Sequence, residues 1–213
     1  AHRDLHLSLR RQRQMCIRDR LEVLEKNKVD CACLKGLRCC GMPAWEQGDL
    51  ETLRVNAKHN LEILIPFVEK GSKVLVINPT CSMMMRREYK NLLEGEDRER
   101  AIILSEAVND PSEYLWNIRS EERFNTDVKS LPNESLSYHA PCHLRAQGIG
   151  FKGRDLIKKI TGSNVKTVME CCGHDGTYAM KVEGFEASKR IGKKSFDGMK
   201  SVSYTHLTLP TKA

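Results

Sequence analysis

The sequence lacks the features that would place a protein in a membrane or outside the cell. No run of about 18 apolar residues occurs in the 213-residue chain, so no membrane-spanning helix is predicted. No apolar segment is followed by a small-residue cleavage site, which argues against secretion. We therefore expect a cytoplasmic protein.

A broad excess of positive charge is also lacking. The formal net charge is +7, from 35 Lys and Arg against 28 Asp and Glu, but much of the excess lies in residues 1–20. The rest of the chain is close to neutral. Nucleic-acid binding therefore has little electrostatic support, and no nucleic-acid partner is expected.

The nine cysteines lack the pattern of a disulfide framework. Disulfide-dense domains are small and rich in loops, whereas this chain carries long helical and strand patterns. Adjacent cysteines cannot close a disulfide with each other without strain, and the count is odd. Cysteines of this kind indicate metal ligation in a reducing cytosol.

Two Cys-Cys-Gly triplets are present, and each is matched to a single cysteine at long range. Cys81 lies 41 positions after Cys40, and Cys142 lies 29 positions before Cys171. Neighbouring thiolates on one sharp turn can both face a multi-iron cluster, and the glycine after them lets the backbone bend. The pattern predicts iron–sulfur chemistry at two sites, with six candidate ligands: Cys39, Cys40, Cys81, Cys142, Cys171 and Cys172.

Short strands are predicted to lead into these cysteines. In the first half we expect a strand over 29–34, a helix over 49–70, a buried strand over 73–78 and a helix over 82–93. Asp49 is the expected N-cap of the first helix, and Gly71 its stop. Residues 94–134 predict two short helices with a break at Asp110-Pro111. In the second half we expect a strand over 136–140, a helix over 151–161, a strand over 165–169 and a helix over 183–200.

These elements predict an α/β fold of two tandem α/β units, with short parallel sheets and cysteine clusters at the strand ends. The first unit is expected to cover 21–93, a helical connector 94–134, and the second unit 135–200. Cys39, Cys40 and Cys81 should converge, as should Cys142, Cys171 and Cys172 in a separate place.

Both ends of the chain have an unusual sequence. Residues 14–20 and 202–213 resemble translated sequencing-adapter sequence, so 1–20 and 201–213 are interpreted as a non-native leader and tail. The alternative is a basic amphipathic leader and a β-rich tail. On the first interpretation Cys16 is not a ligand, and both ends should be exposed, without burying Leu5, Leu7, Leu207 or Leu209.

Several spaced motifs carry a family resemblance: Cys39-Cys40-Gly41-Met42-Pro43 with Gly48-Asp49-Leu50, Asn78-Pro79-Thr80-Cys81, Tyr138-His139-Ala140-Pro141-Cys142-His143, and Glu170-Cys171-Cys172-Gly173-His174-Asp175-Gly176-Thr177-Tyr178. Together they resemble the cysteine-rich CCG domain found in the B subunit of heterodisulfide reductase, the glycolate oxidase iron–sulfur subunit and the C subunit of anaerobic glycerol-3-phosphate dehydrogenase. The last of these types is the most similar.

The resemblance implies tandem repeats that each bind an iron–sulfur cluster, of the 4Fe–4S type, with zinc as the alternative in one unit. It implies a non-catalytic electron-transfer subunit of a multi-component oxidoreductase. Such a subunit relays electrons between a flavin-containing dehydrogenase partner and a quinone or other acceptor. A ferredoxin-like module is a further implied partner. Association with the inner face of the membrane would occur through these partners.

The sequence departs from the family pattern at both ends. The opening Gly-Cys, the closing Asp-Cys-Pro or Cys-x-x-Cys, and the upstream ferredoxin-like module are missing. Each half then lacks at least one family ligand and is interpreted as truncated. We expect a chain of this sequence to bind metal weakly. A version extended through both missing motifs should hold clusters stably and be more stable itself.

Other interpretations stay open. A zinc-binding structural or interaction module is one, because cysteine sets of this size suit tetrahedral zinc. A heterodisulfide reductase-type catalytic subunit is another. Cys31 and Cys33 alternate on a predicted strand, so burial is expected, with Cys33 as a reserve ligand. Three histidines flank the cysteines and could donate hydrogen bonds to cluster sulfurs, or be surface or packing residues: His139, His143 and His174.

Overall fold

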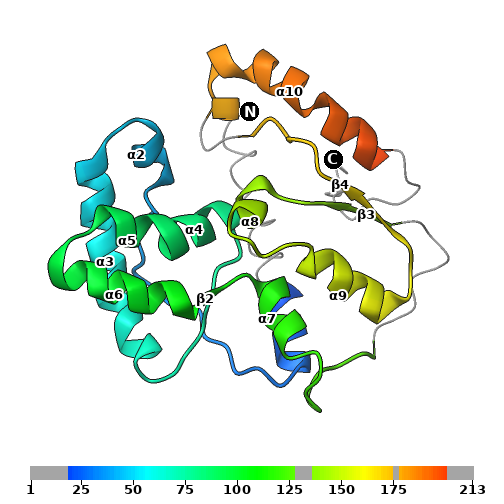
Figure 1. Ribbon diagram of the computed structural model, residues 1–213, viewed down its shortest axis with the longest axis horizontal. Helices are drawn as coiled ribbons and strands as arrows, with labels where there is room; N and C mark the ends of the chain where they lie inside the picture. Colours follow the sequence, from blue (N-terminus) through cyan, green and yellow to red (C-terminus); the bar gives the residue numbers. More distant parts are fainter. Residues whose placement is uncertain (1–18, 128–135, 175–177, 201–213) are drawn as a thin grey trace, which may run out of the picture.

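The computed structural model describes residues 19–127, 136–174 and 178–200. Two separate two-stranded parallel sheets lie among helices, one in each half of the chain (Figure 1). The predicted α/β class with short parallel sheets is therefore confirmed. The expectations for residues 1–18 and 201–213 lie outside the described residues.

The first half is built around a long helix, α3 (Leu50–Val68). Asp49 caps it as predicted, since its side chain accepts a hydrogen bond from Thr52 N at 3.0 Å. Leu53, Ala57 and Leu61 repeat at helical spacing and are fully buried. The remaining elements of this half are a helix over 19–26, α2 (Met42–Glu46), β1 (Val74–Leu75), α4 (Pro79–Met83), a π-helical turn (Met84–Glu88), α5 (Tyr89–Leu92), α6 (Gly95–Ala107), β2 (Val108–Asn109) and α7 (Pro111–Asn117).

One expectation for this half is wrong, and one strand was not predicted. Residues 29–34 do not form a strand, because no strand among the described residues pairs with them. Val29 instead packs in a small apolar cluster with Leu115 and Leu156. The partner of β1 lies in the predicted helical connector, where Val108 pairs with Val74 in parallel. The connector's two helices and the break at Asp110 are present, but the strand between them was missed.

The second half follows the prediction more closely. β3 (Leu136–His139) and β4 (Val165–Val168) pair in parallel, with His139 opposite Val168. The helices are α8 (Cys142–Ala146), α9 (Lys152–Thr161) and α10 (Val182–Lys200), with a 3-10 turn over Tyr178–Met180. Figure 1 shows α9 and α10 on opposite sides of this sheet. Because β3 and β4 are parallel, their carboxyl ends lie at the same edge of the sheet.

The main core lies in the first half and is made mostly by helices. α3 packs on α6, and the π-helical turn and α5 pack on α6 as well. Its fully buried large side chains include Leu53, Leu61, Leu64, Met84, Tyr89 and Leu104. Met84 and Met85 are also buried in this core, and the side chain of Arg86, the next residue, is only 18% exposed.

Polar contacts join the two halves where α4 meets α8. Ser82, which is fully buried, donates to Gln147 Oε1 at 2.8 Å. Gln147 Nε2 donates to the carbonyl of Pro79 at 3.2 Å, and Arg87 donates to the carbonyl of Ala146 at 2.7 Å. The helices that begin at the two single cysteine motifs are thus fixed against each other.

Glu113 forms a second link between the halves. Its carboxylate accepts from Arg86 at 2.8 Å and from Lys152 at 3.2 Å. Arg86 also donates to the carbonyl of Val108, in β2. Burial alone would raise the pKa of Glu113, but the hydrogen bonds and charges of Arg86 and Lys152 outweigh it and hold that pKa below its usual value.

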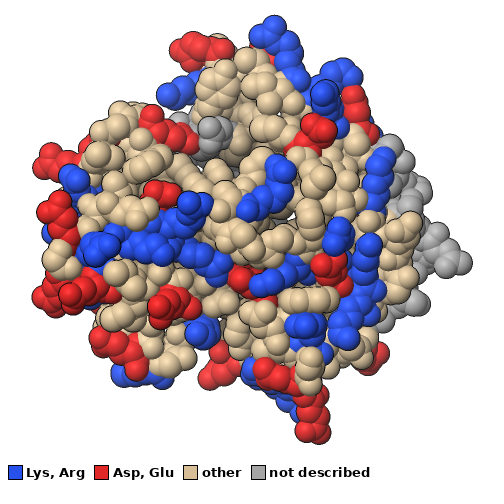
Figure 2. Space-filling view, viewed as in Figure 1, with Lys and Arg blue, Asp and Glu red and all other residues tan. Residues whose placement is uncertain are grey.

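The surface carries mixed charge. Figure 2 shows lysine and arginine side chains in a band over α5 and α4, with acidic side chains on either side. Among the described residues, no helix is long and apolar enough to cross a membrane.

Replacing Glu113 by Gln is expected to lower the free energy of unfolding by about 1–3 kcal/mol at neutral pH, because a buried charge loses its partner. The folded-state pKa is lowered, so the stabilisation is present above the ordinary value of 4.5 and is lost as pH falls through the folded-state pKa. Urea unfolding should show the gap between the original protein and E113Q shrinking from about pH 4.5 towards about pH 3.

Glu62, exposed on α3, supplies the matched control. Glu62→Gln should leave the free energy of unfolding almost unchanged across this pH range. A gap for E113Q that stays constant down to about pH 3 would contradict a stabilising ion pair at this position.

Candidate metal centre

The first Cys-Cys-Gly triplet forms a tight loop that ends at α2. Gly41 is the N-cap residue of α2 and has φ +93°, a left-handed conformation that favours glycine. A Cβ at Gly41 would lie 2.8 Å from Leu53 Cγ, so the loop is pressed against α3. Cys39 is exposed and Cys40 is only 6% exposed. The turn therefore directs two adjacent thiols to different environments.

Cys81 approaches this loop from the start of α4. Asn78 caps that helix, accepting from Thr80 N at 2.9 Å and Cys81 N at 3.3 Å. Cys81 packs against the buried core cluster that contains Cys40. The interaction with Cys81, together with burial, raises the pKa of Cys40, and the same interaction lowers the pKa of Cys81. Cys39 is the third thiol of this group, because its side chain also interacts with that of Cys40.

The three cysteines of the first half thus converge, although Cys81 is distant in sequence. Their convergence follows from the packing of α2 on α3 and of Cys81 against the core cluster that contains Cys40. Their role as ligands stays a prediction. Cys33 is exposed and Cys31 is partly buried against the small apolar cluster, so the expected burial holds in part for Cys31 and is wrong for Cys33.

The second set of cysteines lies at the carboxyl edge of the β3–β4 sheet. Ala140 N donates to the carbonyl of Val168 at 2.9 Å, so both chains leave the sheet side by side. Cys142 then begins α8, and its sulfur accepts from Arg145 at 3.4 Å. The Cys171 sulfur accepts from Gly173 N at 3.4 Å. In the part of the chain that the structure describes, the sulfur hydrogen bonds of Cys142, Cys171 and Cys172 go to groups other than thiols, so the predicted convergence of these three cysteines stays a prediction.

Gly173 fixes the second loop against α10. It has φ +76°, and its carbonyl accepts from the Ser188 hydroxyl at 2.7 Å. A Cβ at Gly173 would collide with the carbonyl oxygen of Ser188, and one at Gly192 would press on the carbonyl of Cys172. The small residues of α10 therefore permit the backbone of this loop to lie directly on the helix.

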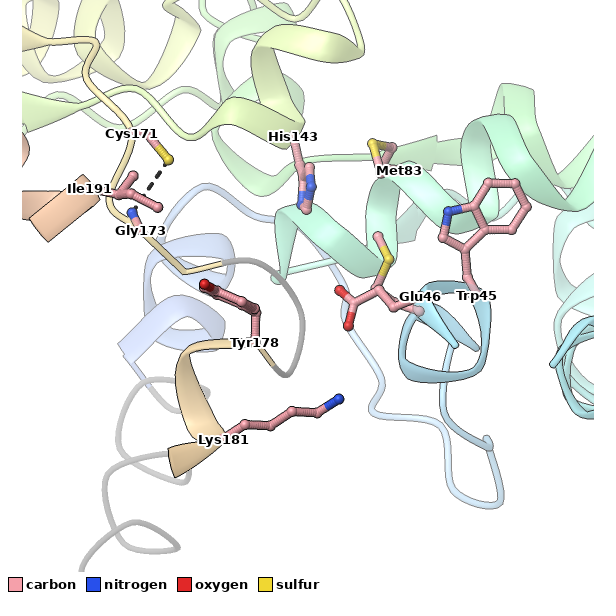
Figure 3. A pocket seen from close by; sticks show the side chains of 10 residues that line it. Trp45, Glu46, Met83, His143, Cys171, Gly173, Tyr178, Lys181 and Ile191 are labelled. Carbon is pink, nitrogen blue, oxygen red and sulfur yellow. Dashed lines mark hydrogen bonds between the residues drawn. The ribbon is translucent and has the colours of Figure 1, made fainter. Parts of the chain in front are cut away.

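A cavity of about 750 Å³ lies between the two sets of cysteines and is lined by Cys171 and by residues that follow the first triplet and Cys81. Figure 3 shows Cys171 and Gly173 on one side, Met83, Trp45 and Glu46 on the other, and His143 between them. Tyr178, Lys181, Ile191 and Met42 complete the lining. Met42 follows the first triplet and Met83 lies two residues after Cys81. Both thus line the same cavity as Cys171 and Gly173 of the second triplet.

The flanking histidines contact protein groups. Thr80 Oγ1 and His143 Nδ1 share a hydrogen bond of 2.7 Å, which links the residue before Cys81 to the residue after Cys142. His139 Nε2 donates to the carbonyl of Glu170 at 2.9 Å. His174 is exposed. The predicted hydrogen bonds to cluster sulfurs stay a prediction for all three.

The donor set consists of thiols, carried on two loops and in the first turns of two short helices, α4 and α8. Within the described residues, no group of three or more His, Cys, Asp or Glu side chains is arranged to hold a metal ion. The first site nevertheless fits an iron–sulfur cluster in two respects. Its three potential ligands are all thiols, the donors that such clusters use, and Gly41 leaves the loop free of a side chain where it meets α3.

The sequence-based reasoning missed two buried polar residues behind the first loop, Asn60 and Tyr89. Both are fully buried. Asn60 could have been found as the polar residue that interrupts the apolar stripe of α3, between Ala57 and Leu61. Tyr89 gave no comparable signal, because a tyrosine at helical spacing is usual in a core.

Comparison with known families assigns the chain to a class. The model of the CCG cysteine-rich domain matches residues 9–86 and 136–210. These two segments make up most of the chain and contain both Cys-Cys-Gly triplets and both single cysteines. The chain therefore belongs to the CCG cysteine-rich domain family.

Curated relatives share this class at modest identity. The chain is 28% identical over 181 residues to the C subunit of anaerobic glycerol-3-phosphate dehydrogenase of Escherichia coli (strain K12), covering 84% of this chain and 44% of the relative. It is 27% identical over 168 residues to lactate utilization protein A 2 of Bacillus cereus (strain AH820), covering 76% of this chain and 66% of the relative. The chain thus spans less than half the length of the first relative. No solved structure matches it.

Gly173→Ala is expected to destabilise the protein by about 2–5 kcal/mol, from the left-handed backbone and the collision with α10 together. Gly162→Ala is the matched control, because Gly162 also has a positive φ, +67°, but has open space around it. That control should cost only about 1–2 kcal/mol. Free energies from urea unfolding would measure both, and equal costs would show that the loop does not need its close approach to α10.

Proposed function

We propose that this chain is an iron–sulfur electron-transfer subunit of a multi-component oxidoreductase, similar in role to the C subunit of anaerobic glycerol-3-phosphate dehydrogenase. The proposed ligands are Cys39, Cys40 and Cys81 at the first site, and Cys142, Cys171 and Cys172 at the second. The observation that carries the proposal is that Cys81 packs against the core cluster that contains Cys40, although the two residues are 41 positions apart in the sequence.

The folding of the first site supports this role for its cysteines. Three thiols come together without forming a disulfide, and each is held by backbone that is fixed elsewhere. The cap at Asn78 orients Cys81, and the left-handed Gly41 orients Cys39 and Cys40. A 4Fe–4S cluster bound here would supply one-electron redox chemistry. The residues of the chain hold the thiolates and shield Cys40 from solvent.

The second site supports the same role less directly. Its cysteines leave neighbouring parallel strands at one sheet edge, the usual location of sites in open α/β sheets. Cys171 also faces the cavity that residues next to the first site line. Two redox centres on one cavity would be suited to passing electrons through the subunit. The link from Thr80 to His143 would keep their spacing constant.

The partners belong to the same proposal. A flavin-containing dehydrogenase subunit would deliver electrons, a ferredoxin-like module would take part in the relay, and a quinone or other acceptor would receive them. The name of the Escherichia coli relative, the C subunit of a dehydrogenase, supports a multi-component assembly. We propose a cytoplasmic location, with any association with the inner face of the membrane occurring through partners.

The test is anaerobic reconstitution with iron and sulfide, followed by assay of iron, acid-labile sulfide and zinc per chain. Iron and sulfide are expected in similar amounts. Cys81→Ser should lower the iron affinity of the first site by more than the roughly 10–100-fold seen when an outer-sphere partner is lost, because a direct ligand is removed. Cys33→Ser should leave iron content unchanged, since Cys33 is exposed and is not part of the proposed ligand set.

Each other outcome has a definite meaning. Stoichiometric zinc without sulfide would support a zinc-binding structural module instead. Equal iron loss in Cys81→Ser and Cys33→Ser would contradict the proposed ligand set. A bound cluster that reduces a disulfide substrate without any partner subunit would favour the catalytic, heterodisulfide reductase-type alternative.

A further inference from the structure

The core of the first half contains two polar side chains that are fully buried. Asn60 on α3 and Tyr89 at the start of α5 are both 0% exposed, among apolar neighbours such as Leu61 and Met84. A buried amide or hydroxyl destabilises a fold unless it is hydrogen-bonded. An apolar pair of similar size would fill this space without needing any hydrogen bond. The role of Asn60 and Tyr89 should therefore be found in the groups to which they are hydrogen-bonded.

Both side chains are hydrogen-bonded to the cysteine loop. Asn60 Oδ1 accepts from Arg38 N at 2.8 Å, and Asn60 Nδ2 donates to Arg38 O at 3.3 Å. Tyr89 Oη donates to Cys40 O at 3.1 Å. The two residues that flank Cys39 are thus pinned through their backbone. This stretch has no regular secondary structure, so no strand or helix holds it.

Asn60 and Tyr89 are also joined to each other. Asn60 Nδ2 donates to Tyr89 Oη at 3.2 Å, so the amide, the phenol and the loop form one network. The backbone N–H of Arg38 can only donate and its carbonyl can only accept, so the orientation of the Asn60 side-chain amide is defined. Burial raises the pKa of Tyr89, so the phenol stays protonated and able to donate at neutral pH.

Tyr89 belongs to the same helical segment as Cys81. That segment runs from α4 through the π-helical turn Met84–Glu88 into α5. A π-helical turn contains an additional residue and so rotates the residues after it relative to the residues before it. Cys81 packs against the core cluster that contains Cys40, and Tyr89 donates to the carbonyl of Cys40. One segment therefore holds Cys40 at both ends.

We propose that Asn60 and Tyr89 are positioning residues of the first site, which fix the Cys39–Cys40 loop so that its thiols face Cys81. The proposal rests on the proposed function for its metal, but the placement of the thiols can be tested without metal. Neither residue would touch a cluster. Each acts through the backbone next to a ligand, as outer-sphere residues of metal sites do.

The second site is held by a different device, which makes it an internal reference. There the Ser188 hydroxyl donates to Gly173 O, and the loop lies directly on the small residues of α10. Loss of Asn60 or Tyr89 should therefore affect Cys40 and leave Cys171 and Cys142 unchanged.

The experiment compares Tyr89→Phe and Asn60→Leu with the original protein, with Tyr138→Phe as the control because Tyr138 is partly buried in the second half. In the metal-free protein, native-state alkylation is followed at each cysteine by mass spectrometry. Tyr89→Phe should speed alkylation of Cys40 by a few-fold to about tenfold, the effect of losing one hydrogen bond. Cys142 and Cys171 should react at the original rate. After reconstitution, iron affinity at the first site should fall by about 10–100-fold.

The outcomes separate this proposal from the function proposed above. If the original protein binds no iron and sulfide, the proposed function fails, while the alkylation rates still decide the role of Tyr89. If Tyr89→Phe alters alkylation no more than Tyr138→Phe does, Tyr89 is only a core residue and the positioning role is overturned. If Asn60→Leu does not fold, Tyr89→Phe alone decides, because it removes one oxygen atom and keeps the ring.

Discussion

In both halves of this molecule a glycine after two cysteines lies in a left-handed turn against a 19-residue helix. Gly41 meets Leu53 of α3, and Gly173 meets the backbone of α10 near Ser188. No side chain fits at either position. The position of each pair of cysteines therefore depends on a helix that begins several residues later in the sequence. Because that helix is part of a packed unit, the cysteines have a defined place even though they lie on loops.

The halves use the same parts in a different order along the chain. In the first, the triplet and its long helix precede β1, Cys81 and β2; in the second, β3, Cys142 and β4 precede the triplet and α10. The single cysteines begin the helices that meet at the junction, through Ser82 and Gln147. Residues that follow the first-site cysteines, Met42 and Met83, consequently line the same cavity as Cys171. Glu113, bound to Arg86 and Lys152, fixes the junction from another direction.

Support for the loops differs between the halves, and the difference is physical. The first loop lies over a core wide enough to contain Asn60 and Tyr89, so side chains reach it from beneath. The second lies on a helix whose buried face carries glycine and serine, so backbone meets backbone. The first arrangement buries polar groups that need every hydrogen bond. The second arrangement requires that no large side chain lies on the helix face where the loop backbone meets it.

Much of the fold could be predicted from the sequence. The α/β class followed from short β-branched runs between helical patterns, and the cap at Asp49 and the break at Asp110 followed from residue types that favour those positions. The two-residue strand Val108–Asn109 was not accessible, because it has no periodicity and exists only through its pairing with β1. The expected strand at 29–34 failed for the converse reason: alternation alone does not supply a partner strand.

The sequence by itself determined which thiols are available and that two pairs of them lie at glycine turns, since this follows from the two Cys-Cys-Gly triplets and their spaced single partners. Only the tertiary structure decided which thiols meet, that Cys40 is buried while Cys39 is exposed, and that Asn60 and Tyr89 lie behind them. Residue types report what a side chain can do locally. The contacts between Cys40, Cys81 and Tyr89 arise when helices pack together. How far apart these residues are in the sequence does not indicate how far apart they lie in space.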